Sequence, residues 1–190
     1  MAAPSPNRYD AVAVILHWTV ALGIFAMLAI GLTMKHADIS KLHMFQLYQL
    51  HKSIGIVILG LVLVRIVWRL THRAPPLPAS MPPLEQEAAH AGHWTLYALM
   101  LALPLIGWGV VSAEPLNIPT VLFGVVPWPH IPFLETLPNK AAVDNVLKAA
   151  HAWGAYLLIV IVLGHVAAAV RHAVKGDVPL KRMSLFAREN

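Results

Sequence analysis

The sequence contains no cysteine and few charged residues. The absence of cysteine excludes disulfides, thiolate zinc sites, iron–sulfur clusters and covalently attached c-type haem. Charged residues make up only 12% of the 190 residues and hydrophobic residues make up 58%, against about 25% and about 45–50% in soluble domains. A soluble fold needs a charged exterior that this chain cannot supply. The composition therefore predicts a membrane protein, with residues 1–190 as a single domain.

Long apolar runs occupy most of the chain. Three runs of 20 to 22 residues carry no Asp, Glu, Lys or Arg: 11–32, 94–113 and 149–170. A fourth run, 53–64, extends to Leu70 because Arg65 and Arg69, near a helix end, can snorkel to the lipid headgroups. A transmembrane helix needs about 20 largely apolar residues, so we predict an all-α, integral membrane four-helix bundle with up-down-up-down topology. The predicted helices lie at about 11–32, 51–70, 92–113 and 149–171.

The basic residues predict how this bundle is oriented. Four spans place both termini on one side of the membrane, and that side carries nine Lys and Arg residues against five on the other. Because basic residues in short loops favour the cytoplasmic side, we expect cytoplasmic termini. The net charge of +5 then belongs to the membrane surface, and we expect membrane lipid and no nucleic acid as a partner.

Four of the eleven histidines fall at two matched depths of the predicted bundle. His17 lies six residues into the first helix and His165 five residues from the end of the last, about 9 Å and 7.5 Å from the same face. His51 opens the second helix and His151 lies two residues into the fourth, so these two share the opposite face. An ionisable residue inside a span marks function by default, although a lone histidine serves equally well in an interhelical hydrogen bond.

Two flat cofactors, each held at both axial positions, fit this arrangement. His151 and His165 are 14 residues apart, which leaves a net rotation of about 40° and an axial separation of about 21 Å. Imidazole is a standard axial ligand of haem iron, and Gly55, Gly154 and Gly164 would either admit a planar macrocycle or serve helix packing. Two imidazoles do not complete a tetrahedral zinc site. A proton relay is an open alternative, but it would not require pairing by depth.

These residues resemble the bacterial cytochrome b561 family over about residues 8–186. Each matching motif is short, and their order and spacing carry the resemblance. The motifs are Ile15-Leu16-His17-Trp18, Leu50-His51-Lys52-Ser53-Ile54-Gly55, Arg65-Ile66-Val67-Trp68-Arg69-Leu70, His90-Ala91-Gly92-His93, Ala102-Leu103-Pro104-Leu105-Ile106-Gly107-Trp108, and His151 followed by His165. The resemblance implies a multi-pass protein of the bacterial inner membrane that binds two non-covalent b haems. It places the axial ligands at His17 with His165 and at His51 with His151.

The resemblance also bears on activity. One type of member oxidises periplasmic superoxide and passes the electron through both haems to ubiquinone, whereas others are electron-transfer partners of dehydrogenases. We therefore predict a di-haem b-type cytochrome that connects a periplasmic donor, superoxide in the first instance, with the ubiquinone pool. The alternative is an electron-transfer or anchor subunit of a membrane-bound dehydrogenase or hydrogenase, with a protein donor. A non-redox four-helix transporter or scaffold is a third possibility, which a haem spectrum would separate from the other two.

Four further polar side chains near the predicted cytoplasmic face are candidates for contact with a quinone, the haem propionates or lipid. His172 lies two turns beyond His165, and in the superoxide-oxidising type the resembling position lies near ubiquinone. His93, at the mouth of the predicted third helix, is too shallow to match His17 and ranks second to His165 as a ligand. We expect His172 and His93 to contact the quinone or the haem propionates, or to have no role beyond the interface. Arg65 and Arg69 would pair with propionates or with lipid phosphates.

Two lysines mark the opposite face. Lys52 adjoins His51, and Lys148 lies three residues before His151, so positive potential there would steer an anion such as superoxide. The alternative is that both lysines are merely solvated. The longest loop, about 114–148, includes an apolar stretch at 121–128 that we expect to reach the membrane interface, because tryptophan favours that level.

Overall fold

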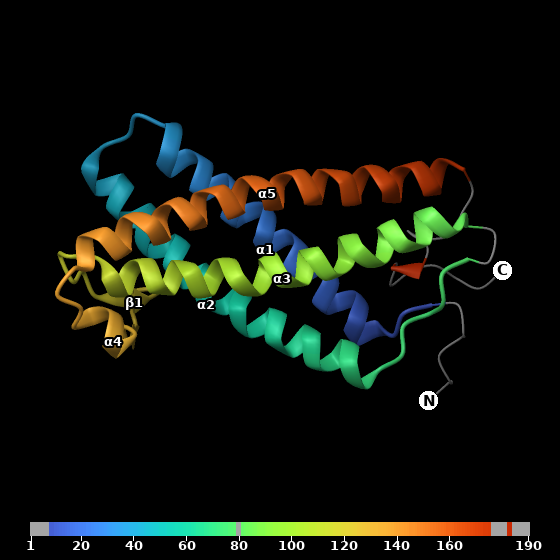
Figure 1. Cartoon of the computed structure of the whole chain (residues 1–190), viewed down its shortest axis with the longest axis horizontal. Helices are drawn as coiled ribbons and strands as arrows, with labels where there is room; N and C mark the ends of the chain where they lie inside the picture. The colour runs from blue at the N-terminus through green and yellow to red at the C-terminus, as the bar shows by residue number, and fades with distance from the viewer. Residues whose placement is uncertain (1–7, 79–80, 176–181, 184–190) are drawn as a thin grey trace.

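Four long helices run alternately up and down in the computed structural model, which describes residues 8–78, 81–175 and 182–183 (Figure 1). The helices are α1 (Ala11–His36), α2 (Lys41–Thr71), α3 (Pro83–Ala113) and α5 (Lys140–Val174). The beginning of α1, the end of α5 and the α2–α3 connection lie at one end of the bundle, called the termini end below. The segment between α3 and α5 covers the other end, called the hairpin end (Figure 1).

All four helices are long and apolar enough to cross a membrane. Their outward faces expose large hydrophobic side chains, including Leu22 (68% exposed), Val160 (63%) and Leu163 (63%). Helices that are apolar all round, with such side chains unburied, suit a lipid environment and would be a liability in water. The predicted all-α, four-helix membrane bundle is confirmed, and the chain is a multi-pass membrane protein.

The helices extend further than the apolar runs predict. α2 begins at Lys41 instead of about 51, α3 at Pro83 instead of about 92, and α5 at Lys140 instead of about 149. The hydroxyl of Ser40 caps α2 by accepting a hydrogen bond from the backbone N–H of His43. Hydropathy marks only the part of a helix that lies in hydrocarbon, about 30 Å, whereas the 35 residues of α5 span about 52 Å.

A small β-hairpin occupies part of the long loop for which the sequence predicted only an interfacial stretch. Strands β1 (Thr120–Leu122) and β2 (Val126–Trp128) pair antiparallel, with Val121 opposite Pro127. Gly124 in the turn has φ +74°, a backbone conformation that glycine adopts without strain. A one-turn helix, α4 (Pro132–Glu135), follows the hairpin. The loop is therefore an ordered cover on the hairpin end.

Two buried serines attach this cover to the helices. Ser53 on α2 is 1% exposed, and its hydroxyl donates to the carbonyl of Gln49 and accepts from the backbone N–H of Phe123. Ser112 on α3 is 0% exposed and does the same between the carbonyl of Trp108 and the N–H of Ile131. Each hydroxyl uses both its donor and an acceptor position, so the cover is fixed at two points.

Three pairs of helices form most of the packing in the bundle. α3 packs along α5, α1 packs against α2, and α2 packs against α3. One buried apolar cluster joins all four helices midway along the bundle, and Leu158, its member on α5, lies seven residues from each of His151 and His165. The members of this central cluster are Val20, Ile24, Ile58, Val62, Met100, Leu103 and Leu158.

Candidate functional site

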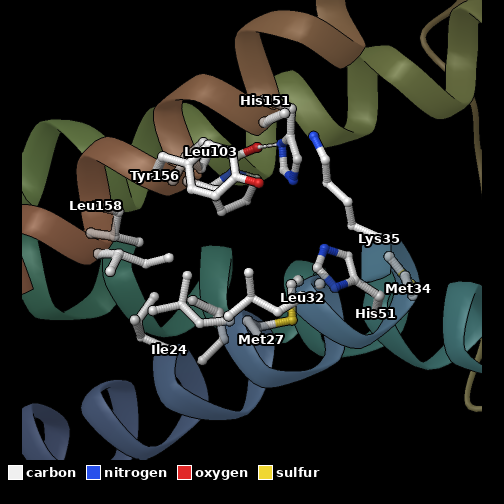
Figure 2. Close-up of a pocket in the computed structure, with 18 of the residues that line it drawn as sticks. Ile24, Met27, Leu32, Met34, Lys35, His51, Leu103, His151, Tyr156 and Leu158 are labelled. Atoms are coloured by element: carbon white, nitrogen blue, oxygen red, sulfur yellow. Dashed lines mark hydrogen bonds between the residues drawn. The ribbon is translucent and has the colours of Figure 1, made fainter. Parts of the chain in front are cut away.

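His51 on α2 and His151 on α5 face each other across a pocket near the hairpin end (Figure 2). Their ring centroids are 6.1 Å apart. Because α2 and α5 both begin earlier than predicted, His51 lies ten residues and His151 eleven residues inside its helix. The prediction that these residues stand at the helix mouths is therefore wrong, although both share one level of the bundle.

The backbone of α3 orients His151. The Nδ1 atom of His151 lies 3.1 Å from the carbonyl oxygen of Leu103. A carbonyl only accepts hydrogen bonds, so Nδ1 carries the proton and Nε2 keeps its lone pair. A carbonyl partner of this kind commonly fixes the tautomer and direction of a metal-binding histidine.

Gly107 provides the space for that contact. A Cβ atom at position 107 would lie 3.5 Å from Nδ1 of His151 and only 3.2 Å from Cε1, and the second distance is tighter than an ordinary van der Waals contact. A side chain there would push the imidazole away from the carbonyl of Leu103. The sequence offered only a weak signal for this role, a glycine in the motif that also contains Pro104.

His51 lacks a comparable partner. Its Nδ1 atom is buried and, among the described residues, has no hydrogen bond. Burying a polar atom without a hydrogen-bond partner costs free energy. A purely structural role does not explain why this imidazole is buried here.

The pocket between the two rings is almost entirely apolar. Its empty space, which includes the opening, is about 930 Å³. Ile24, Met27, Leu103 and Leu158 line its inner side, and Lys35 lies at its edge (Figure 2). The pocket therefore suits a largely apolar group held between two imidazoles.

A second cavity adjoins the first beneath the β-hairpin. It shares His51 and His151 with the first pocket and has an empty space of about 1,460 Å³, including its opening. Lys52 and Lys148, the two lysines predicted to steer an anion, both line it. Lys148, however, is paired with Glu114 at 2.9 Å and with Asp144 at 2.6 Å, so its charge is offset locally.

A second pair of imidazoles lies nearer the termini end. The ring centroids of His17 on α1 and His165 on α5 are 6.3 Å apart. His93 on α3 is a third member of this group, with its ring centroid 5.5 Å from that of His165. The prediction that His93 is too shallow to match this level is wrong, because α3 begins at Pro83 and places His93 ten residues inside the helix.

Arg65 turns toward this second pair. Its Nη2 atom donates to Nδ1 of His17 at 2.8 Å, and its Nε atom donates to the hydroxyl of Tyr97 at 3.3 Å. The guanidinium also lies over the Tyr97 ring, 5.6 Å from its centroid. Arg69, one turn further along α2, is exposed. Of the two arginines predicted as propionate or lipid contacts, only Arg65 reaches the histidines, and Tyr97 is a contact that the sequence reasoning missed.

His172 lies beside an acidic residue that the sequence reasoning also missed. Its Nε2 atom is 3.5 Å from one carboxylate oxygen of Glu85, and Nη2 of Arg171 is 2.9 Å from the other. Glu85 stands in the first turn of α3, so these ion pairs tie the beginning of α3 to the end of α5. His172 and Glu85 thus form a histidine–carboxylate pair at the termini end.

Only some of the glycines proposed to admit a macrocycle line a pocket. Gly55 lines both cavities. A Cβ at Gly154 would lie 2.8 Å from the side chain of Leu103, so this glycine serves the packing of α5 on α3, the alternative that the sequence left open. At Gly164 a Cβ would meet nothing within 4 Å.

The spacing of the two pairs fits a six-coordinate haem iron. Metal–imidazole bonds of about 2 Å, added to ring radii of about 1.1 Å, place two opposing ring centroids about 6.3 Å apart. The observed separations are 6.1 and 6.3 Å. α5 packs mainly along α3. Each histidine pair, by contrast, joins α5 to another helix: His51 lies on α2 and His17 on α1. Within the described residues no group of three or more His, Cys, Asp or Glu side chains could hold a bare metal ion.

Paired imidazoles between membrane-spanning helices are the features of a membrane-bound b-type cytochrome. Comparisons with known proteins agree: the family model for prokaryotic cytochrome b561 matches residues 8–184. The chain belongs to the prokaryotic cytochrome b561 family, as its resemblance predicted. It is a membrane b-type cytochrome of electron transfer, and membership implies b-type haem.

Three curated relatives match nearly the whole chain. Cytochrome b561 homolog 2 of Escherichia coli is 33% identical over 94% of this chain and 92% of its own length. The probable superoxide oxidase CybB of Yersinia pestis is 31% identical, over 93% of this chain and 96% of its own length. Cytochrome b561 homolog 1 of Escherichia coli is 25% identical, over 93% and 97% respectively.

Proposed function

We propose that this chain binds two non-covalent b haems and carries electrons between them across the membrane. His51 and His151 would hold one haem near the hairpin end, and His17 and His165 the other near the termini end. The observation that carries this proposal is the pair of imidazole separations, 6.1 and 6.3 Å, at two levels of one bundle. His93 would lie beside the second haem without ligating it.

We further propose that superoxide is the donor and ubiquinone the acceptor. The likeness to a probable superoxide oxidase and the cavity beside Lys52 under the hairpin support a small anionic donor at that end. The excess of basic residues at the termini end supports a cytoplasmic position in the inner membrane for that end. The hairpin end then faces the periplasm.

The residues of this chain would perform three tasks. Bound haem would supply an iron that takes up and gives up one electron at a time. The four imidazoles would hold the two haems, two imidazoles for each, so the donor would react without binding iron. The carbonyl of Leu103 orients His151, and the central apolar cluster keeps water out of the space between the two levels.

In the proposed reaction, the protons that the quinone needs are taken up at the termini end. Each superoxide loses one electron and becomes dioxygen. Two such electrons and two protons convert one ubiquinone into ubiquinol. His172 and Glu85, 3.5 Å apart, would deliver protons to a quinone at this end, because imidazole and carboxylate groups are the side chains that most often transfer protons in enzymes.

The test is a spectrum followed by rapid kinetics on the purified protein. We expect two haems per chain by pyridine haemochrome assay, b-type bands after dithionite reduction, and haem reduction by micromolar superoxide that is reversed by added ubiquinone. Absence of haem would overturn the whole proposal. Two haems that superoxide fails to reduce would overturn only the donor and favour the alternative, an electron-transfer subunit that co-purifies with a dehydrogenase or hydrogenase.

A further inference from the structure

Lys35 lies in the last turn of α1, where its side chain reaches the edge of the pocket between His51 and His151 (Figure 2). Lys35 and His151 both line this pocket (Figure 2). The sequence places this lysine among the ordinary loop residues beyond the first span. It belongs to the site because α1 continues to His36.

Lys35 is the one formally charged side chain among the described residues that line this pocket. None of the ion pairs and hydrogen bonds of the described residues includes it; its contact is with the ring of Tyr156, whose centroid lies 5.5 Å from Nζ. The aromatic face attracts a cation only weakly at an exposed site. The ammonium therefore keeps its capacity to donate three hydrogen bonds to an anion.

Lys148 differs from Lys35 in this respect. Lys148, in the cavity under the hairpin, already contacts the carboxylates of Glu114 and Asp144. Glu114 also lines that cavity together with Lys52, so the second cavity has charges of both signs. In the first pocket, by contrast, the single positive charge of Lys35 lies at the mouth between α1 and α5 with no carboxylate among the lining residues.

A b haem has one polar edge, which carries two carboxylates, and the remainder of its macrocycle is apolar. Since it is not covalently attached, the protein must stabilise that edge by water or by a cation, while the apolar part enters the pocket. A charge-assisted hydrogen bond from an ammonium to a carboxylate is among the stronger contacts available. The apolar lining and the single cation at the mouth match these two parts of the molecule.

We propose that Lys35 binds the carboxylate edge of the haem held by His51 and His151 and directs that edge to the mouth between α1 and α5. This inference rests on the proposed function, because it requires a haem at this level. It leaves the cavity under the β-hairpin free for the electron donor. The positive charge also favours the reduced haem, which has one negative charge more than the oxidised haem.

The test is a redox titration of the purified holoprotein in detergent, comparing Lys35→Gln with Lys35→Arg. Lys41→Gln is the matched control, because Lys41 begins α2 at the same end of the bundle and lines neither cavity. The two haems are assigned with His151→Ala, which retains only the haem at the termini end. We expect Lys35→Gln to shift the reduction equilibrium of the hairpin-end haem about tenfold toward the oxidised form, or 59 mV for one electron.

We expect Lys35→Arg to retain the wild-type potential. The potential of the second haem should not change, and Lys41→Gln should behave as the wild type. Loss of the hairpin-end haem in Lys35→Gln with rescue by Lys35→Arg would support the proposal equally. Unchanged potentials in Lys35→Gln, or equal shifts in Lys35→Gln and Lys41→Gln, would overturn it while leaving the di-haem assignment intact. A wild-type protein without haem would instead overturn the proposed function.

Discussion

The two imidazole pairs are similar in spacing and different in surroundings. His51 and His151 lie in an apolar pocket, and a backbone carbonyl fixes the direction of His151. The pair near the termini end, His17 and His165, has a guanidinium and a third imidazole beside it. One level of the bundle is therefore built around a backbone contact, and the other around contacts between polar side chains.

The two levels differ in which ring nitrogen of the histidine carries the proton. A carbonyl oxygen only accepts, so His151 presents an unprotonated Nε2 to the pocket. Arg65 only donates, so Nδ1 of His17 accepts and the proton lies on Nε2 in the neutral ring. Ligation of iron through Nε2 of His17 requires Arg65 to release this bond and turn to Tyr97 or to a carboxylate. The hairpin-end site is thus preorganised, whereas the proposed binding of haem at the termini end would include a rearrangement.

Removal of one ligand from each level should have the largest effect. We expect His151→Ala to lose the hairpin-end haem and His165→Ala to lose the other, so that each variant holds about one haem per chain and titrates as one redox component. His93→Ala is the control for His165→Ala, because it removes the adjacent imidazole without removing a proposed ligand. Two haems with normal potentials in either ligand variant would contradict the assignment.

Crowding the contact between His151 and Leu103 should weaken only the preorganised level. In Gly107→Val the new side chain would displace the imidazole, and loss of such a supporting contact typically lowers metal affinity by about 10- to 100-fold. The measurement is the rate of haem loss from each level to an acceptor protein. Gly60→Val is a matched control, since a Cβ there meets nothing within 4 Å. Equal haem loss in both variants would show that Gly107 has no specific role.

Neutralising Arg65 should alter the other level and leave the hairpin end unchanged. Arg65→Gln removes a positive charge beside His17, so we expect the potential of the termini-end haem to fall by the order of 50 mV, where about 59 mV corresponds to a tenfold change. Arg69→Gln, whose side chain is exposed, should shift it less. A redox titration resolved into two components checks this, and an equal shift of both haems would argue against a local role for Arg65.

The smallest expected effect concerns the contact that holds the beginning of α1 to α2. Asp10 caps α1 by accepting from the N–H of Ala13, and it accepts from the indole of Trp68 at 3.1 Å. Partial burial acts to raise the pKa of Asp10, but these hydrogen bonds outweigh it and hold the pKa below its ordinary value. The resulting stabilisation is present above the unfolded pKa of 3.8 and is lost as the pH falls through the lower folded pKa.

Asp10→Ala should therefore lower the free energy of unfolding by about 1 kcal/mol at neutral pH, the usual cost of a lost helix cap. Asp10→Asn keeps the cap and removes the charge, so it should retain most of the stability and lose the acid-dependent part. Thermal unfolding in detergent at pH 3.5 and pH 7 measures both. A wild-type protein whose stability relative to Asp10→Asn is the same at the two pH values would exclude the proposed pH dependence.

Much of the fold follows from the sequence because lipid imposes a simple rule. Each span must be helical and apolar for about 20 residues, so charge-free runs indicated three helices, and a run extended through Arg65 and Arg69 indicated the fourth. The helical rise then placed four histidines at two depths, and the structure brings the same pairs together. Their function as haem ligands stays a prediction that the mutants above would test.

The remaining features depend on contacts between distant residues. Ser53 and Ser112 are ordinary small polar residues in the sequence, and only the folded chain shows that they bind the backbone of the hairpin. Arg65 was equally compatible with lipid phosphates until the packing of α2 against α1 and α3 turned it inward. The extension of α3 placed His93 beside His165, because Pro83 suits the first position of a helix and hydropathy does not mark that start.

The sequence by itself determined the membrane environment, the number of helices and which histidines share a depth, since these depend on composition and on the regular helical rise. The tertiary structure decided which nitrogen of His151 is protonated, which arginine reaches His17 and that Lys35 lies at the mouth of a pocket. These features depend on the direction of side chains and on the backbone groups opposite them, which are set only when helices distant in the chain pack together.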